Sequence, residues 1–285
     1  MKKNKLILIF IFLSIISLFG INDKIYAQEN SKLYMIIFAN TDAEDIGKCC
    51  MVDYNNMIKE AEKISNYTGL TLIKKYYYGS DFTKNNLIET IDNLECTIND
   101  IVFFYFTGHG FRYKNMDNDP LPILSVPDYQ YKIDMKYIKE KIESKNPRLS
   151  IIIADCCNQE VNITKTEELA TVEVIKENYK NLFLRTKGSV VATSSKAGKS
   201  GESYEGFSYC NPRIGGIFTY CFLLSLHQLT ESNYNKKATW EDLMNNTKNQ
   251  ISNLKIYTNT QIPYYNINVE YTSDMIEDFS IKLKK

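Results

Sequence analysis

The chain has 285 residues, which is enough for one large domain or two small ones. Hydrophobic residues make up 44% and charged residues 24%, so a globular protein is expected and a disordered one is excluded. The 34 Lys and Arg residues balance 34 Asp and Glu residues. This balance argues against a nucleic-acid-binding protein, which needs a basic surplus to neutralise phosphates.

Residues 1–27 have the pattern of a secretory signal peptide. Three lysines stand within the first five positions, the apolar run Leu6–Ile21 follows, and Ala27 is a small residue at a plausible cleavage site. We therefore expect an exported protein, periplasmic or secreted, whose mature chain is 28–285 and has no stable membrane span. The alternative is an uncleaved anchor, although the apolar run is shorter than the about 20 residues that a span needs.

Taken in chain order, the residues after the leader alternate between strand and helix patterns. We predict strands at 33–38 and 70–78 on either side of a helix that contains Val52 to Ile64 and stops at Gly69. A helix over 87–94, a buried strand at 101–106, a helix over 135–142 and strands at 149–154 and 189–193 follow. An apolar helix at 216–229 and a helix that begins at Thr239 complete the pattern.

This alternation predicts an α/β fold with a mainly parallel central sheet and helices on both faces. Residues 158–187 interrupt the rhythm and are rich in Lys, Glu, Thr and Asn, which favours an inserted loop that is mobile or partly helical. Ligand sites in such sheets lie beyond the carboxyl ends of the strands. The residues that follow the strands are therefore the candidates for chemistry.

Seven cysteines, an odd number, leave at least one thiol unpaired within the chain. No Cys-x-x-Cys pair and no Cys/His cluster at zinc spacing is present, so no metal site is predicted. An unpaired thiol in an exported protein is either buried and inert or a nucleophile.

Two strands run into residues that suit nucleophilic catalysis. The strand at 101–106 continues into Thr-Gly-His-Gly, which contains His109, and the strand at 149–154 continues into Asp-Cys-Cys, which contains Cys156 and Cys157. Both strand ends fall at the same edge of a parallel sheet, so the imidazole is expected beside a thiol that it activates. Because neighbours in a strand alternate in direction, one of the two cysteines is expected to face the core.

The glycines on both sides of His109 allow a sharp turn and a close approach to substrate. The backbone amides of Gly110 and Cys157 are candidates for an oxyanion hole. The other histidine of the chain, His227, lies at the polar end of a helix and is predicted to be a surface residue.

These motifs together resemble those of caspase-like cysteine peptidases, especially metacaspases and their bacterial relatives. Phe-Tyr-Phe-Thr-Gly-His-Gly is similar to the histidine motif and Ile-Ala-Asp-Cys-Cys to the cysteine motif of that family. Cys157 comes 48 residues after His109, and the spacing in caspases is about 50. Three further stretches agree, and the resemblance spans about residues 32–268. They are Ile46–Cys49 with Asp53, Gly215–Tyr220 and Gln261–Pro263.

The resemblance implies a caspase-like fold and a role for each site residue. Cys157 would be the nucleophile and His109 the proton donor to the leaving amine. Asp155 and Asp53 match two carboxylates that hold a basic substrate side chain, and paired carboxylates suit an Arg or Lys. For Asp53 the alternative is a solvated helix residue. Ser194 and Ser195, after the next strand, fit a substrate-binding wall.

We therefore interpret the chain as an exported cysteine endopeptidase that cuts protein or peptide substrates after Arg or Lys, with no metal or organic cofactor. Self-processing is predicted within residues 158–187, which carry four Lys residues and one Arg. Asp117–Asp119 is too short for a calcium loop, and calcium dependence stays open. Two alternatives remain: a catalytically degenerate caspase-like binding module, and a thiol–disulfide enzyme built on Cys156 and Cys157.

Overall fold

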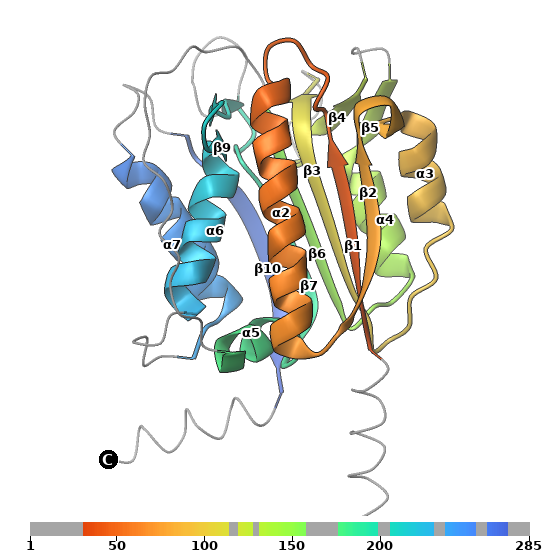
Figure 1. Cartoon of the computed structure of the whole chain (residues 1–285), viewed down its shortest axis with the longest axis vertical. Coiled ribbons are helices and arrows are strands. Elements are labelled where there is room, and N and C mark those ends of the chain that lie inside the picture. The colour runs from red at the N-terminus through yellow and green to blue at the C-terminus, as the bar shows by residue number, and fades with distance from the viewer. Residues whose placement is uncertain are drawn as a thin grey trace, which may run out of the picture.

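The computed structural model describes residues 31–113, 119–127, 131–157, 176–198, 206–230, 237–254 and 261–272. Its centre is a sheet whose strands lie in the order β10-β7-β6-β3-β1-β2 (Figure 1). The strands are β1 (Lys32–Ala39), β2 (Thr71–Tyr78), β3 (Ile101–Phe111), β6 (Leu149–Cys157), β7 (Thr186–Thr193) and β10 (Tyr264–Tyr271). All neighbours pair in parallel except β10, which runs antiparallel to β7, so the predicted mainly parallel sheet is confirmed.

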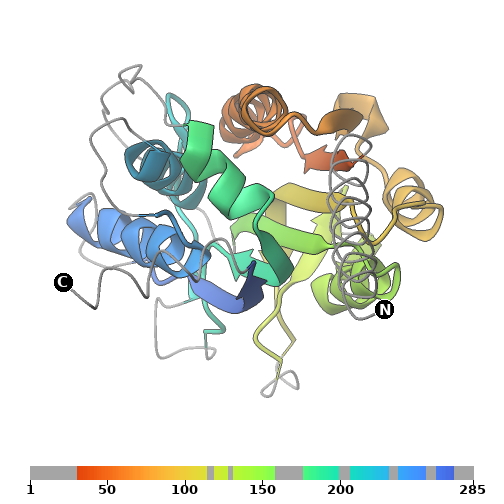
Figure 2. The same ribbon diagram turned by 90° about the horizontal axis from the view of Figure 1, so that it is seen from below.

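Helices cover both faces of the sheet, as predicted, and form three layers with it (Figure 2). One face carries α2 (Gly47–Thr68), α5 (Lys176–Phe183), α6 (Ile217–Thr230) and α7 (Trp240–Asn253). The other face carries α3 (Lys84–Asp92) and α4 (Met135–Ser144). A short 3₁₀ turn, η1 (Gly79–Asp81), follows β2.

Strand alternation divides the core between these two faces. In β6, Ile151 and Ile153 pack on the α2 side, whereas Ile152 and Ala154 pack on the α4 side. The same alternation governs β3, where Tyr105 packs on the α2 side. Consecutive residues at the carboxyl ends of β3 and β6 therefore point to opposite faces of the sheet.

The predicted helix ends are confirmed where the sequence carried a specific signal. Gly69 ends α2 with a φ of 80°, a left-handed conformation that glycine adopts without strain. Thr239 caps α7, and its Oγ1 accepts a hydrogen bond of 3.1 Å from the backbone N–H of Asp242.

Two strands extend beyond their predicted ends at Phe106 and Ala154. Strand β3 continues to Phe111 because its last residues pair with β4 (Ile123–Val126), which in turn pairs with β5 (Tyr131–Asp134). Strand β6 continues to Cys157 because it stays paired with β3. His109 therefore lies within a strand, and the expected sharp turn between its two glycines is absent.

The predicted insertion at 158–187 is only partly within the described residues. Its second part, 176–187, forms α5 and the start of β7, and Tyr179, Leu182 and Phe183 of α5 are core residues. Residues 158–175 and the predicted signal peptide at 1–27 lie outside the described residues. Within the described ranges, no helix combines the length and the apolar character needed to cross a membrane.

Candidate active site

His109 and Cys157 are direct partners in the sheet. The parallel register of β3 and β6 runs unbroken from Ile101 opposite Leu149 to His109 opposite Cys157. Neighbouring strands are about 4.8 Å apart, so the backbones of the two residues are adjacent at the carboxyl edge of the sheet. The structure thus brings together the two residues that the sequence predicts as a catalytic pair.

A carboxylate that the sequence analysis missed contacts the His109 ring. Nε2 of His109 lies 2.9 Å from Oδ1 of Asp45, in the connection between β1 and α2. The same oxygen accepts a 2.9 Å hydrogen bond from the backbone N–H of Ile46. The His109 side chain is 13% exposed and the Asp45 side chain 34%. Asp45 lies in a polar stretch whose residues show no helix or strand periodicity. The signal that could have identified it is its position in the connection that follows β1, because β1 pairs with β3.

Cys156 faces the core, as expected for one member of the cysteine pair. It is 3% exposed and packs on the α4 side of the sheet. A Cβ at Gly110 would lie 2.6 Å from the Cβ of Cys156, so this contact requires glycine at position 110. Gly110 itself pairs with Leu124 of β4.

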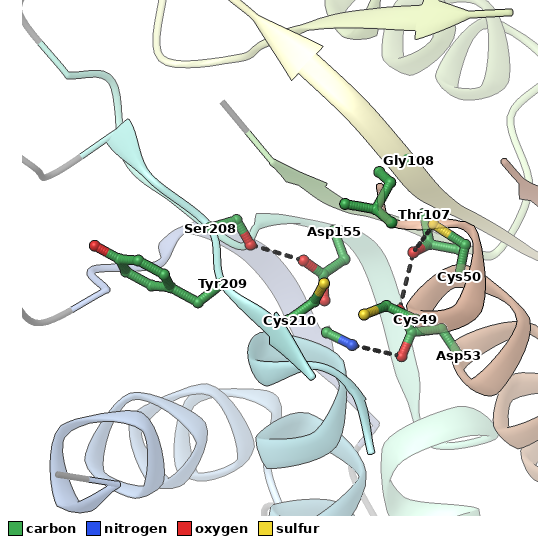
Figure 3. A pocket seen from close by; sticks show the side chains of 11 residues that line it. Cys49, Cys50, Asp53, Thr107, Gly108, Asp155, Ser208, Tyr209 and Cys210 are labelled. Carbon is green, nitrogen blue, oxygen red and sulfur yellow. Dashed lines mark hydrogen bonds between the residues drawn. The ribbon is translucent and has the colours of Figure 1, made fainter. Parts of the chain in front are cut away.

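A pocket near the His109–Cys157 pair contains both predicted substrate-binding carboxylates, Asp53 and Asp155 (Figure 3). Its cavity volume is about 20 Å³, which is room for little more than a water molecule and far below the 300–1,000 Å³ typical of whole-ligand sites. Residues from α2, β3, β6 and the hairpin of β8 (Cys210–Asn211) and β9 (Gly215–Gly216) contribute to it. The lining consists of Ile46, Cys49, Cys50, Asp53, Thr107, Gly108, Asp155, Ser208, Tyr209, Cys210 and Gly216.

Asp53 is held on the pocket side of α2. Its exposed fraction is 1%, which excludes the alternative of a solvated helix residue. Thr107 Oγ1 donates a 2.9 Å hydrogen bond to Oδ2, and the backbone N–H of Gly216 donates one of 2.9 Å to Oδ1. Each oxygen of Asp53 therefore has one of these donors and keeps further acceptor capacity.

Asp155 is held from the opposite side of the pocket and is 5% exposed. Ser208 Oγ donates a 2.9 Å hydrogen bond to Oδ1. Oδ2 accepts from Thr219 twice, at 3.1 Å from the backbone N–H and at 2.7 Å from Oγ1. The hydroxyl of Tyr105 lies 2.8 Å from Thr219 Oγ1 and extends this chain of hydrogen bonds into the core.

Burial raises the pKa of both carboxyl groups. For Asp53, desolvation is the largest cause and the charge of Asp155 adds to it, while the donors Thr107 and Gly216 oppose the rise. For Asp155, desolvation again outweighs the hydrogen bonds from its donors. In the part of the chain that the structure describes, no Lys or Arg forms an ion pair with either group. Two buried carboxylates without a cation are costly, so the pocket is suited to a cation that arrives with a ligand.

Three thiols near the pocket are unsuited to nucleophilic attack. Burial raises the pKa of Cys50 and Cys221, and the interaction with the Cys49 thiol followed by burial raises that of Cys210. Cys49 and Cys210 point toward one another across the pocket (Figure 3). A thiol whose pKa is raised stays protonated at neutral pH and is inert.

Ser194 and Ser195 lie where β7 ends, beside the end of β6. Ser194 is 1% exposed, and its Oγ is 3.2 Å from both the backbone nitrogen and the backbone oxygen of Cys156. Gln261 Nε2 donates to the Ser194 carbonyl at 2.8 Å, and Gln261 Oε1 accepts from the Tyr209 N–H at 3.0 Å. Gln261 thus connects the β7 end to the pocket wall, while substrate binding by the two serines stays a prediction.

A hollow on the other side of the site borders His109. It is lined by Asn40, Asp42, Ala43, Glu44, Asp45, Gly79, Ser80, Phe82, Thr83, His109, Ser125 and Pro127. Three of these residues are carboxylates of the connection between β1 and α2. Among the described residues, no group of three or more His, Cys, Asp or Glu side chains is arranged to hold a metal ion.

Comparison with protein families identifies the family of this chain. The model described as "Caspase domain" matches residues 36–271, a span that includes the His109–Cys157 pair, the two-carboxylate pocket and Asp45. The comparison with curated proteins found no significant match.

Proposed function

The chain belongs to the caspase-domain family of cysteine peptidases, and on that premise we propose that it is an exported endopeptidase that cleaves after Arg or Lys. The observation that carries the specificity is the pair of buried carboxylates, Asp53 and Asp155, with no basic partner among the described residues. The N-terminal lysines and apolar run support export.

The pocket supports recognition of a basic side chain through fixed acceptors. Donors from Thr107, Gly216, Ser208 and Thr219 hold the carboxylate oxygens in place, so little ordering is left for the moment of binding. A guanidinium or ammonium group would make charge-assisted hydrogen bonds to the remaining acceptor positions. An acidic substrate side chain would meet two like charges and be rejected.

The register supports the chemistry. His109 takes the proton of the Cys157 thiol, and the resulting thiolate attacks the carbonyl carbon of the scissile bond. The N–H groups of Gly110 and Cys157 stabilise the oxyanion. His109 then donates its proton to the leaving amine, so the C–N bond breaks and a thioester with Cys157 remains. Water then attacks the thioester carbonyl carbon and the C–S bond breaks. The acyl fragment leaves as a carboxylic acid, and the remaining proton of the water restores the thiol.

The test is a cleavage assay of the chain from residue 28 on peptides that differ only in the residue before the bond, with Arg, Lys, Asp, Asn and Leu. We expect cleavage of the Arg and Lys peptides, and none by Cys157→Ala. Preference for Asp or Leu would contradict the assignment of the pocket. Tight binding of basic peptides without cleavage by the wild type would instead identify a degenerate binding module.

A further inference from the structure

We propose that Asp45 is a positioning residue for His109, so that the catalytic group is a Cys157–His109–Asp45 triad. This inference rests on the proposed function, because it assigns His109 to proton transfer. It goes beyond the Cys/His pair, since Asp45 lies 64 residues before the histidine and in no motif of the sequence.

The hydrogen bond determines which ring nitrogen carries a proton. An ionised carboxylate has no hydrogen to donate, so in the 2.9 Å contact Nε2 of His109 is the donor and Oδ1 of Asp45 the acceptor. Nε2 is then committed to Asp45, and proton exchange with the thiol and the leaving amine uses Nδ1. When Nδ1 takes up a proton, the Asp45 carboxylate stabilises the imidazolium.

The surrounding backbone holds the Asp45 carboxylate in place. The Ile46 N–H donates to the same Oδ1, and Asp45 directly precedes Ile46, the N-cap residue of α2. The positive end of the helix dipole favours a negative charge there. Because Ala39 at the end of β1 pairs with Thr107 of β3, the connection that follows β1 passes close to His109.

The exposure of the Asp45 side chain distinguishes a role in positioning His109 from a role in folding stability. With the Asp45 side chain 34% exposed, the ion pair contributes little to folding stability. A large loss of activity without a matching fall in melting temperature therefore indicates an effect on the imidazole. Asp42, Glu44 and Asp45 all line the hollow that borders His109, so three carboxyl groups contribute to the electrostatic environment of the imidazole.

The test compares Asp45→Asn with Glu44→Gln, which removes one negative charge from the adjacent exposed residue. On an Arg peptide we expect Asp45→Asn to lower kcat roughly 10- to 100-fold, within or just below the range for general acid–base catalysis. The effect is smaller than in a buried triad because water reaches this site. KM and melting temperature should change little, Asp45→Glu should recover part of kcat, and Glu44→Gln should match the wild type.

A second readout is nitrogen-15 NMR of the histidine rings. The chain has two histidines, and His227→Gln assigns the signals. We expect His109 to carry its hydrogen on Nε2 in the wild type and to lose this preference for one ring nitrogen in Asp45→Asn. Unchanged kcat in Asp45→Asn, or an equal loss in Glu44→Gln, would overturn the role of Asp45. If the wild type cleaves no peptide, the proposed function fails, and an unchanged His109 spectrum in Asp45→Asn would still refute the contact.

Discussion

The backbone of Gly216 lies directly against the carboxylate of Asp155. A Cβ at Gly216 would lie 2.1 Å from Oδ2 of Asp155 and 3.1 Å from Oδ2 of Asp53. Gly215, with a φ of 87°, is equally close to Asp53, since a Cβ there would lie 1.9 Å from its Oδ1. The hairpin of β8 and β9 therefore supplies a wall of bare backbone that packs against both carboxylates.

The first prediction concerns this wall. Gly216→Ala should displace Asp155 and lower kcat/KM on Arg peptides at least about tenfold, because van der Waals overlap of this size forces the backbone or the carboxylate to move. Alkylation of Cys157 by iodoacetamide should continue, since the change leaves the His109–Cys157 register intact. Gly69→Ala is the control: its φ of 80° imposes backbone strain, but nothing lies within 4 Å of the added Cβ. An unchanged preference for Arg peptides in Gly216→Ala would contradict the assignment of the pocket as the site that binds the basic side chain.

The second prediction concerns Asp155. Removing one partner of a buried charge pair costs about 2–5 kcal/mol, so Asp155→Asn should lower efficiency on basic substrates by about 30-fold or more. The amide fits the site because its oxygen accepts from Thr219 while its NH₂ group donates to the Ser208 hydroxyl. Asp53→Asn should act in the same direction more weakly. Rates on the peptide panel measure this, and an unchanged rate in Asp155→Asn would refute the role.

The third prediction concerns pH and stability. Burial raises the pKa of Asp53 and Asp155 in the folded state, so folding favours their protonated forms. The stability that this preference contributes is present below the unfolded pKa and is lost as pH rises through the raised folded pKa. The melting temperature of Asp155→Asn minus that of the wild type should therefore increase as pH rises from acidic to neutral. A difference in melting temperature that does not vary with pH would contradict this.

The same ionisation controls substrate binding. Because the charged form binds a guanidinium, KM for Arg peptides should fall as pH rises through the raised pKa values, and a neutral substrate should show no such trend. Steady-state kinetics on matched Arg and Leu peptides separate the two. A KM for Arg peptides that rises with pH would show that the carboxylates do not bind the cation.

The fourth prediction separates the two adjacent cysteines. Cys157→Ala and His109→Ala should abolish cleavage, whereas Cys156→Ala should retain much of it. Because Cys156 packs in the core, its truncation should lower stability by about 1–2 kcal/mol through the small cavity that it leaves. Cleavage rates and thermal melts together test this. Equal loss of activity in Cys156→Ala without unfolding would overturn the assignment of the nucleophile.

The fifth prediction concerns self-processing, which we expected within 158–187. Cleavage in 176–187 would require unfolding of α5 or β7, whose residues Tyr179, Leu182 and Phe183 lie in the core. The expected cut is therefore in 158–175, where Lys165 is a basic residue. Mass spectrometry of wild type and Cys157→Ala should show the cut in the wild type alone. An intact, fully active wild-type chain would dispose of the idea.

The sequence predicted the sheet and the partnership of His109 with Cys157 because buried parallel strands read as continuous apolar runs. It misplaced the strand ends because Thr, Gly and His in β3 look like a loop, although pairing with β4 and β6 keeps them in the strand. The helix prediction worked where a local signal such as Gly69 was present.

The parts of the site that sequence reasoning missed depend on long-range contacts. Asp45 contacts His109 only after β1 and β3 pair. Gln261 was singled out in the sequence, but its hydrogen bonds to Ser194 and Tyr209, 67 and 52 positions away in the chain, were not predicted. His227 was predicted to lie on the surface, yet its side chain is 21% exposed and Nε2 is 3.1 Å from Glu60 of α2. The periodicity of a single helix or strand cannot predict contacts between residues that are far apart in the sequence.

The order of the pocket residues along the chain has a consequence for biosynthesis. His109 and Cys157 are both present once β6 has been made, but Ser208, Gly216 and Thr219, which hold the two carboxylates, come from the last third of the chain. A ribosome-bound chain that ends at β6 thus contains the proposed catalytic pair without the complete two-carboxylate pocket. On the proposed function, cleavage selective for basic residues therefore requires synthesis of the β8–β9 hairpin and α6, and a shorter nascent polypeptide lacks the donors that hold the two carboxylates.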